Sequence, residues 1–242
     1  MLVWLVVVVV SFSCRENNRH KTALVHPVTK IEKKPEKPLF RKSSLELQLE
    51  KAGLVNVCEL DSSIRFDLKY AGKDNFTKSV LYDTLRSIYL QPEVAQKLIR
   101  AQGILKSKNP SLRLLVWDAA RPMSVQRKMY AKVSGTPLHN YVADPTRTGL
   151  HNYGCAVDIT ICSTDGSLFD MGTPFDYFGK NAGILQEQRF VQQGILTKKQ
   201  LENRQLLRKV MCEAGFLTVT GEWWHFNAFR LAGAKRRYAL LN

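Results

Sequence analysis

Four polar residues that suit a single metal site lie in two distant segments of this chain. His151 and Asp158 belong to the run Gly-Leu-His-Asn-Tyr-Gly-Cys-Ala-Val-Asp, and the second segment reads Glu222-Trp-Trp-His225. Two histidines and one carboxylate make a zinc site with a free fourth position, which is typical of catalytic rather than structural zinc. A fold that uses this site must therefore bring the two segments side by side.

Each segment alone also has a simpler interpretation. Asp158 lies in an apolar run that predicts a strand, where a carboxylate is costly unless it is paired or bound to metal. A hydrogen-bonded pair of His151 and Asp158 that holds a loop fits this run as well. His225 stands among tryptophan and phenylalanine residues, so a core histidine is the simpler interpretation of the second segment.

Glu222 precedes His225 by three residues and is a candidate base for a zinc-bound water. In a regular strand the two side chains would point to opposite faces, because side chains alternate. We therefore expect Glu222 to lie before the regular strand or at a bulge, next to Gly221.

Hydrophobic periodicity places these residues on an α+β fold. A single small domain is expected, with a central, mainly antiparallel sheet flanked by helices. The predicted helices run from Pro92 to the Asn109-Pro110 stop, from about 124 to 132, and from the N-cap Thr197 to about 214. The predicted strands cover residues 63–70, 112–117, 155–161 and 216–226.

Arg121 stands near the end of the run Leu-Leu-Val-Trp-Asp-Ala-Ala-Arg-Pro, where a buried strand is expected to end. Asp118 can pair with this arginine and fix its direction. A fixed guanidinium can stabilise an oxyanion on a polarised carbonyl. The alternative is a surface salt bridge, which contributes under about 1 kcal/mol.

The chain is basic, with a formal net charge of +15 over 242 residues. Such a charge can attract nucleic acid, but the sequence has neither paired zinc-finger cysteines nor an aromatic RNA-binding strand. We therefore predict no nucleic-acid partner. Cys58, Cys155, Cys162 and Cys212 form no CxxC pair and lie in apolar runs, so buried free thiols without an essential disulfide are expected.

The first residues resemble a bacterial lipoprotein signal. Residues 2–10 are apolar and too few to span a bilayer, which needs about 20 residues, and Ser-Phe-Ser-Cys14 follows. We expect a signal segment over 1–14, a lipidated Cys14, a basic flexible tether over 15–43 and the folded domain over 44–242. The protein would be an exported, membrane-anchored lipoprotein on the periplasmic or cell-surface side. An uncleaved anchor or a misassigned start is the alternative.

Taken together, the motifs resemble the D-alanyl-D-alanine dipeptidases of the zinc D,D-peptidase family, from about Asp61 to Asn227. The resemblance includes Phe66-Asp-Leu-Lys-Tyr-Ala, the run that ends in Arg-Pro, and Met171-Gly-Thr-Pro-Phe-Asp. It also includes both metal-ligand segments. Two positions differ: Gly149 stands where the family often has serine, and Phe178-Gly-Lys-Asn stands where the family often has a histidine pair.

The resemblance implies a role for each site residue. His151, Asp158 and His225 would bind one Zn²⁺ per chain, and Glu222 would act as the base and then as the acid. Arg121 would stabilise the tetrahedral intermediate. Asp176 would receive the ammonium group of the substrate, and Asp118 would assist substrate binding next to Arg121.

The function implied by the resemblance is zinc-dependent hydrolysis of D-Ala-D-Ala or a related cell-wall dipeptide. One alternative is a D,D- or L,D-carboxypeptidase that acts on longer wall peptides. Another is a non-catalytic zinc- or wall-binding lipoprotein, because a fold alone does not imply turnover. The substrate's stereochemistry and the oligomeric state stay open at this point.

Overall fold

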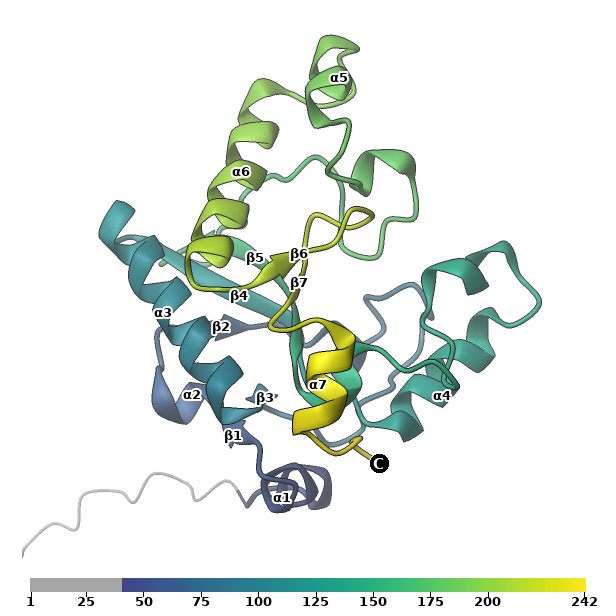
Figure 1. The fold of residues 1–242 in the computed structure, drawn as a ribbon. Coiled ribbons are helices and arrows are strands. Elements are labelled where there is room, and N and C mark those ends of the chain that lie inside the picture. The colour runs from purple at the N-terminus through teal and green to yellow at the C-terminus, as the bar shows by residue number, and fades with distance from the viewer. Residues whose placement is uncertain (1–40) are drawn as a thin grey trace, which may run out of the picture. The chain divides into compact units, whose positions relative to one another are not determined.

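A five-stranded sheet in the order β2-β4-β5-β7-β6 runs through the protein (Figure 1). The computed structural model describes residues 41–242. The pairs β4–β5, β5–β7 and β6–β7 are antiparallel, whereas β2 and β4 are parallel. The predicted α+β fold with a mainly antiparallel sheet is thus confirmed, with one parallel pair that makes the sheet mixed.

The long strands lie in the middle of the sheet, and helices separate them along the chain. The strands are β1 Val55–Asn56, β2 Arg65–Phe66, β3 Tyr89–Leu90, β4 Leu112–Asp118, β5 Ala156–Ser163, β6 Leu217–Thr218 and β7 His225–Asn227. The helices are α1 Ser44–Lys51, α2 Val57–Leu60, α3 Pro92–Lys108, α4 Met123–Val133, α5 Glu187–Gln192, α6 Lys198–Glu213 and α7 Leu231–Arg237. The small strands β1 and β3 pair with each other, apart from the large sheet.

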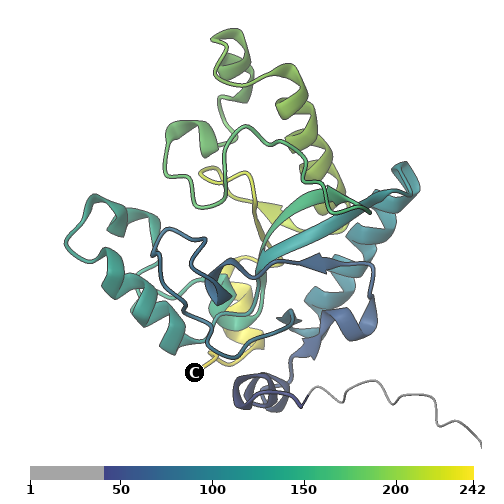
Figure 2. The same ribbon diagram turned by 180° about the vertical axis from the view of Figure 1, so that it is seen from behind.

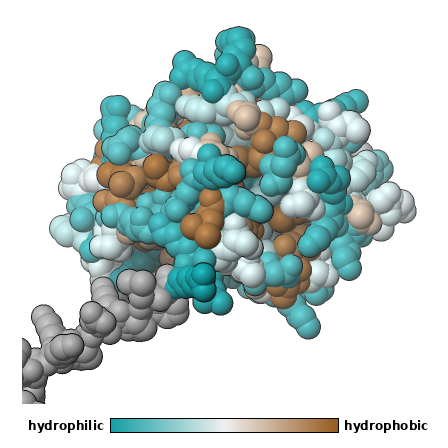
Figure 3. Space-filling model, turned by 90° about the horizontal axis from the view of Figure 1, so that it is seen from below, coloured by the Kyte–Doolittle hydropathy of each residue, from teal (hydrophilic) through white to brown (hydrophobic). Residues whose placement is uncertain are grey.

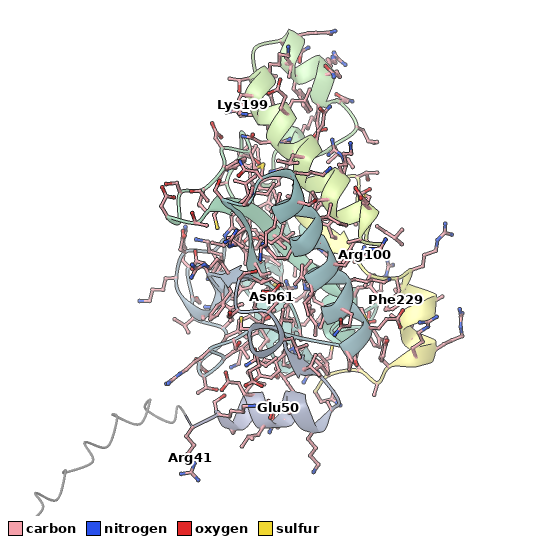
Figure 4. All side chains as sticks on the ribbon, turned by 90° about the vertical axis from the view of Figure 1, so that its left-hand side faces the viewer. Arg41, Glu50, Asp61, Arg100, Lys199 and Phe229 are labelled. Atoms are coloured by element: carbon pink, nitrogen blue, oxygen red, sulfur yellow. The ribbon has the colours of Figure 1, made fainter. Side chains whose placement is uncertain are left out.

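Helices α3 and α6 pack against each other, and α3 also packs on β4 (Figure 4). Val94, Leu98 and Leu105 recur at helical spacing along α3 and are fully buried. Thr197 caps α6 through its side chain, and Gly215 ends that helix with a φ of +94°. Both helices were predicted because their buried faces follow the helical period.

The segment before α3 and helix α4 share a second hydrophobic cluster (Figure 2). Tyr70 and Tyr82 from the segment, and Val125 and Met129 from α4, are buried in it. This cluster lies next to the end of β4, and it supports the residues that follow that strand.

Two strand predictions were too long. Within residues 63–70 the strand covers Arg65–Phe66, and the chain then forms a 3-10 helix over Lys69–Ala71. The alternation of Ile64, Phe66, Leu68 and Tyr70 was misleading, because Phe66 is exposed and the burial of Tyr70 comes from the turn. Within 216–226 the chain leaves the sheet after Thr218 and returns at His225.

The four described cysteines are free thiols. Cys155 and Cys162 are buried as expected, whereas Cys58 is half-buried and Cys212 is exposed, so the expectation of burial was wrong for Cys212. Cys212 lies near the end of α6, on the side of the helix that faces solvent.

Residues 41–242 form one compact unit. No helix in this part of the chain is long and apolar enough to cross a membrane. Hydrophobic residues gather in patches between hydrophilic ones on the face that Figure 3 shows. The expected signal segment, Cys14 and most of the tether lie outside the described residues.

Candidate active site

Strand register brings the two metal-ligand segments together. Asp158 of β5 lies directly opposite His225 of β7, and Asp158 Oδ1 is 2.9 Å from His225 Nδ1. His151 precedes β5 on a 3-10 helix, Leu150–Tyr153, and Gly154 with a φ of +65° turns the chain from that helix toward the strand. One ligand atom from each of the three residues lies within 4.8 Å of the other two.

The histidine rings are held so that their inner nitrogens face each other. His151 Nδ1 donates to the carbonyl of Ala119 at 2.6 Å, and His225 Nε2 donates to Asn227 Oδ1 at 2.9 Å. In the neutral form that a metal requires, the two rings would present lone pairs from His151 Nε2 and His225 Nδ1, which are 3.3 Å apart. Lone pairs that face each other beside a carboxylate repel unless a cation lies among them.

The three residues fit a zinc ion. Zn–N bonds of about 2.0–2.1 Å in tetrahedral geometry place two nitrogens about 3.3 Å apart, which matches the observed separation. The outer bonds to Ala119 and Asn227 are the kind that orient ligating histidines. Burial lowers the pKa of His225, but the hydrogen bond and charge of Asp158 outweigh it and raise that pKa to about 9. The pocket therefore favours a positive charge at this point.

Arg121 is buried and held from two sides. Its Nε donates to Asp118 Oδ2 at 2.9 Å, and its Nη1 donates to Gln126 Oε1 at 3.0 Å. The guanidinium carbon also lies 5.3 Å from the centre of the Tyr70 ring. The alternative of a surface salt bridge is wrong, because Arg121 is 8% exposed and Asp118 is 0% exposed.

Asp118 is fully buried and pairs with Arg121. It accepts hydrogen bonds from Arg121 and from the Tyr82 hydroxyl, the latter at 2.7 Å. Burial lowers the pKa of Arg121, but the charge of Asp118 outweighs it and holds that pKa well above its usual range. Asp118 thus orients Arg121, and the structure gives it no direct place in the cavity wall.

Glu222 precedes β7, outside the regular strand, as predicted. Two backbone bonds hold its segment: Trp223 N donates to the Ala182 carbonyl, and Ile184 N donates to the Thr220 carbonyl, both at 3.0 Å. Glu222 Oε2 lies 3.9 Å from His225 Nδ1. Burial raises the pKa of Glu222 above its usual value, which suits a general base that later returns a proton.

Asp176 lies in a left-handed backbone conformation, with a φ of +57°. The Tyr70 hydroxyl donates to Asp176 Oδ1 at 3.0 Å, and the Phe76 amide donates to Oδ2 at 3.4 Å. Burial and the charge of Asp158 raise the pKa of Asp176 to about 7. A cationic group in the cavity would relieve both effects, so this carboxyl suits an ammonium group.

A cavity of about 320 Å³ joins these residues. Six of the seven predicted site residues line it, namely Arg121, His151, Asp158, Asp176, Glu222 and His225. Apolar side chains that include Met129, Val142 and Leu231 complete the wall. The volume suits a small molecule, because ligand pockets start at about 300 Å³.

The sequence pointed to these residues but not to two that hold them. Tyr70 was assigned to a strand, although its hydroxyl supports Asp176. Gln126 was placed on a helix without a role, yet it accepts from Arg121 and donates to the Ala143 carbonyl at 2.7 Å. No local pattern marks either residue: Tyr70 is 106 residues from Asp176, and Gln126, although five residues from Arg121, contacts it through the start of α4.

A family model described as D-ala-D-ala dipeptidase, of peptidase family M15, matches residues 50–239. This match covers most of the chain and every residue of the cavity named above. The chain belongs to this peptidase family. Members are zinc-dependent in general, which agrees with the histidine and aspartate geometry, and the family assigns the chain to the metallopeptidases.

Curated relatives support the family assignment. A D-alanyl-D-alanine dipeptidase of Escherichia coli (strain K12) is 30% identical over 173 residues, which is 72% of this chain and 83% of that protein. A protein of the same name from Enterococcus faecium is 27% identical over 194 residues, with 72% and 90% covered. A third, from Enterococcus faecalis (strain ATCC 700802 / V583), is 29% identical over 195 residues, with the same coverage.

Proposed function

We propose that this protein is a zinc-dependent dipeptidase that hydrolyses D-Ala-D-Ala or a related cell-wall dipeptide. The observation that carries the proposal is one small cavity that joins three residues able to hold a metal, the half-buried Glu222, the buried Arg121 and the carboxyl of Asp176. A purely structural metal site needs none of the last three. The relatives named D-alanyl-D-alanine dipeptidase support the choice of substrate.

The residues divide the reaction among themselves. A zinc ion held by His151, Asp158 and His225 would supply a Lewis acid that brings the pKa of a water to about 7. Glu222 takes the proton of the attacking water and passes it to the leaving amine, a role that its raised pKa favours. Arg121 stabilises the negative charge that develops on the carbonyl oxygen, because its pair with Asp118 holds it in one direction.

Asp176 accounts for the preference for a dipeptide. A carboxylate held by Tyr70 and Phe76 in the cavity wall suits the free ammonium of the first residue of the substrate. An acylated amino group carries no charge and would leave this half-buried carboxylate without an opposite charge. Hydrolysis should therefore need a free amino terminus within reach of Asp176.

A carboxypeptidase that acts on longer wall peptides is the second candidate, because a second cavity shares a wall with the first. It has a volume of about 610 Å³, and both cavities are lined by Phe76 and Asp176. If the shared wall moved aside, the rest of a longer peptide could extend into this space. N-acetyl-D-Ala-D-Ala distinguishes the candidates: the dipeptidase leaves it intact, and the carboxypeptidase cleaves it.

The test combines metal analysis with a panel of free and acetylated alanyl dipeptides of both hands. The wild-type protein should contain about one zinc per chain and cleave D-Ala-D-Ala. Glu222→Gln should keep the metal and lose turnover by at least about a thousandfold. Glu213→Gln, an exposed glutamate at the end of α6, is the matched control and should behave as wild type. Near-normal turnover of Glu222→Gln would refute the mechanism.

The proposal places the enzyme on the periplasmic or cell-surface side of a membrane, anchored through a lipidated Cys14. The apolar run over 2–10 followed by Cys14 supports it, as does the basic composition of the segment that follows. Metabolic labelling with a fatty-acid analogue should mark the wild-type protein and not Cys14→Ser. Equal labelling of both, or of neither, would contradict the lipid anchor.

A further inference from the structure

Helix α6 holds the segment that carries Asp176, which we call the Asp176 loop (residues 170–182). Arg204 donates from Nε to the Met171 carbonyl at 2.6 Å and from Nη1 to the Asn181 carbonyl at 3.0 Å. Asn203 adds a bond from its amide to the Asp170 carbonyl at 2.9 Å. One side chain of α6 thus joins both ends of the loop.

The same arginine lies where the Asp176 loop meets the Glu222 segment. Its guanidinium carbon is 5.6 Å from the centre of the Trp223 ring, and its Nη2 donates to Thr173 Oγ1 at 3.4 Å. Trp223 Nε1 donates to the same hydroxyl at 2.7 Å. Arg204 therefore contacts the segment that carries Asp176 and the segment that carries Glu222, although it does not line the cavity itself.

Arg204 is a buried charged residue that shares its acidic partner with another arginine. It is 1% exposed, and burial lowers its pKa. Its charge partner, Glu187, lies 3.6 Å from Nη1, but Glu187 has a closer partner in Arg208 at 2.6 Å. Buried ion pairs contribute little net stability compared with apolar residues of similar volume. The bonds to loop carbonyls, which Arg208 does not make, are what set Arg204 apart.

The loop also needs support at Asp176 itself. A left-handed conformation is unfavourable for a residue other than glycine, and it persists where surrounding contacts impose it. Tyr70 and Phe76 hold the carboxylate, but they do not hold the ends of the loop. Arg204 does so, at Met171 and Asn181 on either side of Asp176.

We propose that Arg204 is a positioning residue that sets the carboxylate of Asp176 against the ammonium group of the substrate. The inference rests on the proposed dipeptidase function. It assigns to α6, which lies outside the cavity, control over how tightly the free amino terminus is bound. The metal centre on β5 and β7 does not depend on this arginine.

The test compares Arg204→Met with Arg208→Met in the full-length enzyme. Both variants remove a positive charge next to Glu187, but Arg204 alone of the two bonds the loop. Arg204→Met should raise KM for D-Ala-D-Ala by about tenfold or more, with kcat changed less than about threefold and metal content unchanged. Hydrogen exchange of residues 170–182 should speed up. Arg208→Met should leave KM and exchange as in wild type.

Two outcomes overturn the proposal: an unchanged KM in Arg204→Met, or an equal rise of KM in Arg208→Met. If Arg204→Met does not fold, Arg204→Lys keeps the charge and loses the forked donor, and Thr173→Val removes the shared hydroxyl. Unchanged KM and exchange in both would equally refute the proposal. If the wild-type enzyme cleaves no dipeptide, the proposed function fails. Hydrogen exchange of residues 170–182 in Arg204→Met then still shows whether Arg204 holds the loop.

Discussion

The metal centre and the Asp176 loop meet at one cavity but are built differently. Asp158 and His225 face each other across a ladder of backbone hydrogen bonds between β5 and β7. Asp176 instead depends on side chains from elsewhere, with Tyr70 at its carboxylate and Arg204 at the ends of its loop. Two of the three metal ligands thus lie on paired strands, whereas Asp176 is held by individual side-chain bonds.

This difference predicts how each region responds to substitution. A ligand on a paired strand can be removed without moving its neighbours, because the ladder holds the backbone. A loop held by a few side chains loses its geometry when one of them changes. Substitutions in the first region should abolish turnover at unchanged fold, and those in the second should change substrate affinity by degrees.

The largest effect is expected from His225→Ala. This change removes one of three ligands, so the metal should be lost and kcat/KM should fall by at least about a thousandfold. Metal content and turnover measure the effect, and circular dichroism checks that the sheet persists. His139→Ala, at an exposed histidine, is the control. A variant that retains both metal and turnover would show that His225 is not a ligand.

Asp176→Asn tests the recognition side. Asparagine tolerates the left-handed backbone at this position, so the change removes the charge and leaves the loop in place. KM for D-Ala-D-Ala should rise about 100-fold, because a buried charge-assisted hydrogen bond to the ammonium is lost. Metal content should not change. Asp83→Asn, at an exposed carboxylate, should have wild-type kinetics, and loss of metal in Asp176→Asn would contradict the division between the regions.

The raised pKa of Asp176 gives a pH dependence of stability in the metal-free protein. Its folded-state pKa of about 7 exceeds its usual value of 3.8, so the folded state keeps a proton that the unfolded state has lost. The unfolding free energy of wild type minus that of Asp176→Asn should therefore fall as the pH rises from about 4 to 7, and stay level above pH 7. The fall should be on the order of 2 kcal/mol after allowance for the partial exposure of Asp176. Denaturant unfolding of both stripped proteins checks this, and a difference that grows with pH would disprove it.

The smallest effect is expected at Gly149, in the cavity wall. Its φ of −116° suits any residue, and an added Cβ would lie 3.6 Å from Ala143 Cβ and 3.7 Å from Asn152 Oδ1. Gly149→Ala should change the unfolding free energy by less than about 0.5 kcal/mol. The added methyl group should narrow the cavity, so it should weaken the binding of dipeptides with bulky side chains more than the binding of D-Ala-D-Ala. Equal effects on all dipeptides in a kinetic panel would count against a role in substrate size.

The helices and the metal-ligand residues could be predicted because the evidence for each lies within one short segment of the sequence. The apolar residues of α3 follow the helical period because one side of the helix packs on the sheet. A carboxylate in the apolar run of β5 indicates a nearby partner, because burying it unpaired is costly. The strand prediction over 63–70 was too long, because Phe66 is exposed and Tyr70 is buried by a 3-10 turn rather than by a strand. Sequence periodicity does not distinguish a strand from a turn that buries the same positions.

The recognition side was harder to predict because its parts come from separate segments. Asp118 was expected near the substrate, but the packing of Tyr82 and Arg121 around it determines that it is buried. Arg204 is one of several basic residues in the sequence of α6, and its contacts with two loop carbonyls distinguish it from the others. The pairing of Asp118 with Arg121, three residues further on, was expected from the sequence, whereas the contacts of Arg204 have no local signal because they join segments 33 and 23 residues apart.

Hydrogen bonds between residues 119–121 and 151–152 hold together the two ends of the chain that runs between them. His151 Nδ1 bonds the Ala119 carbonyl, Arg121 N bonds the His151 carbonyl at 2.9 Å, and Asn152 bonds the Arg121 carbonyl at 2.9 Å. Residues 122–150 therefore begin and end at the same place in the fold, where these hydrogen bonds lie. They supply Met129 and Val142 to the cavity wall. Both ends of this segment are therefore fixed at the site, and Gln126 within it also holds Arg121, so the segment is part of what supports the reacting groups.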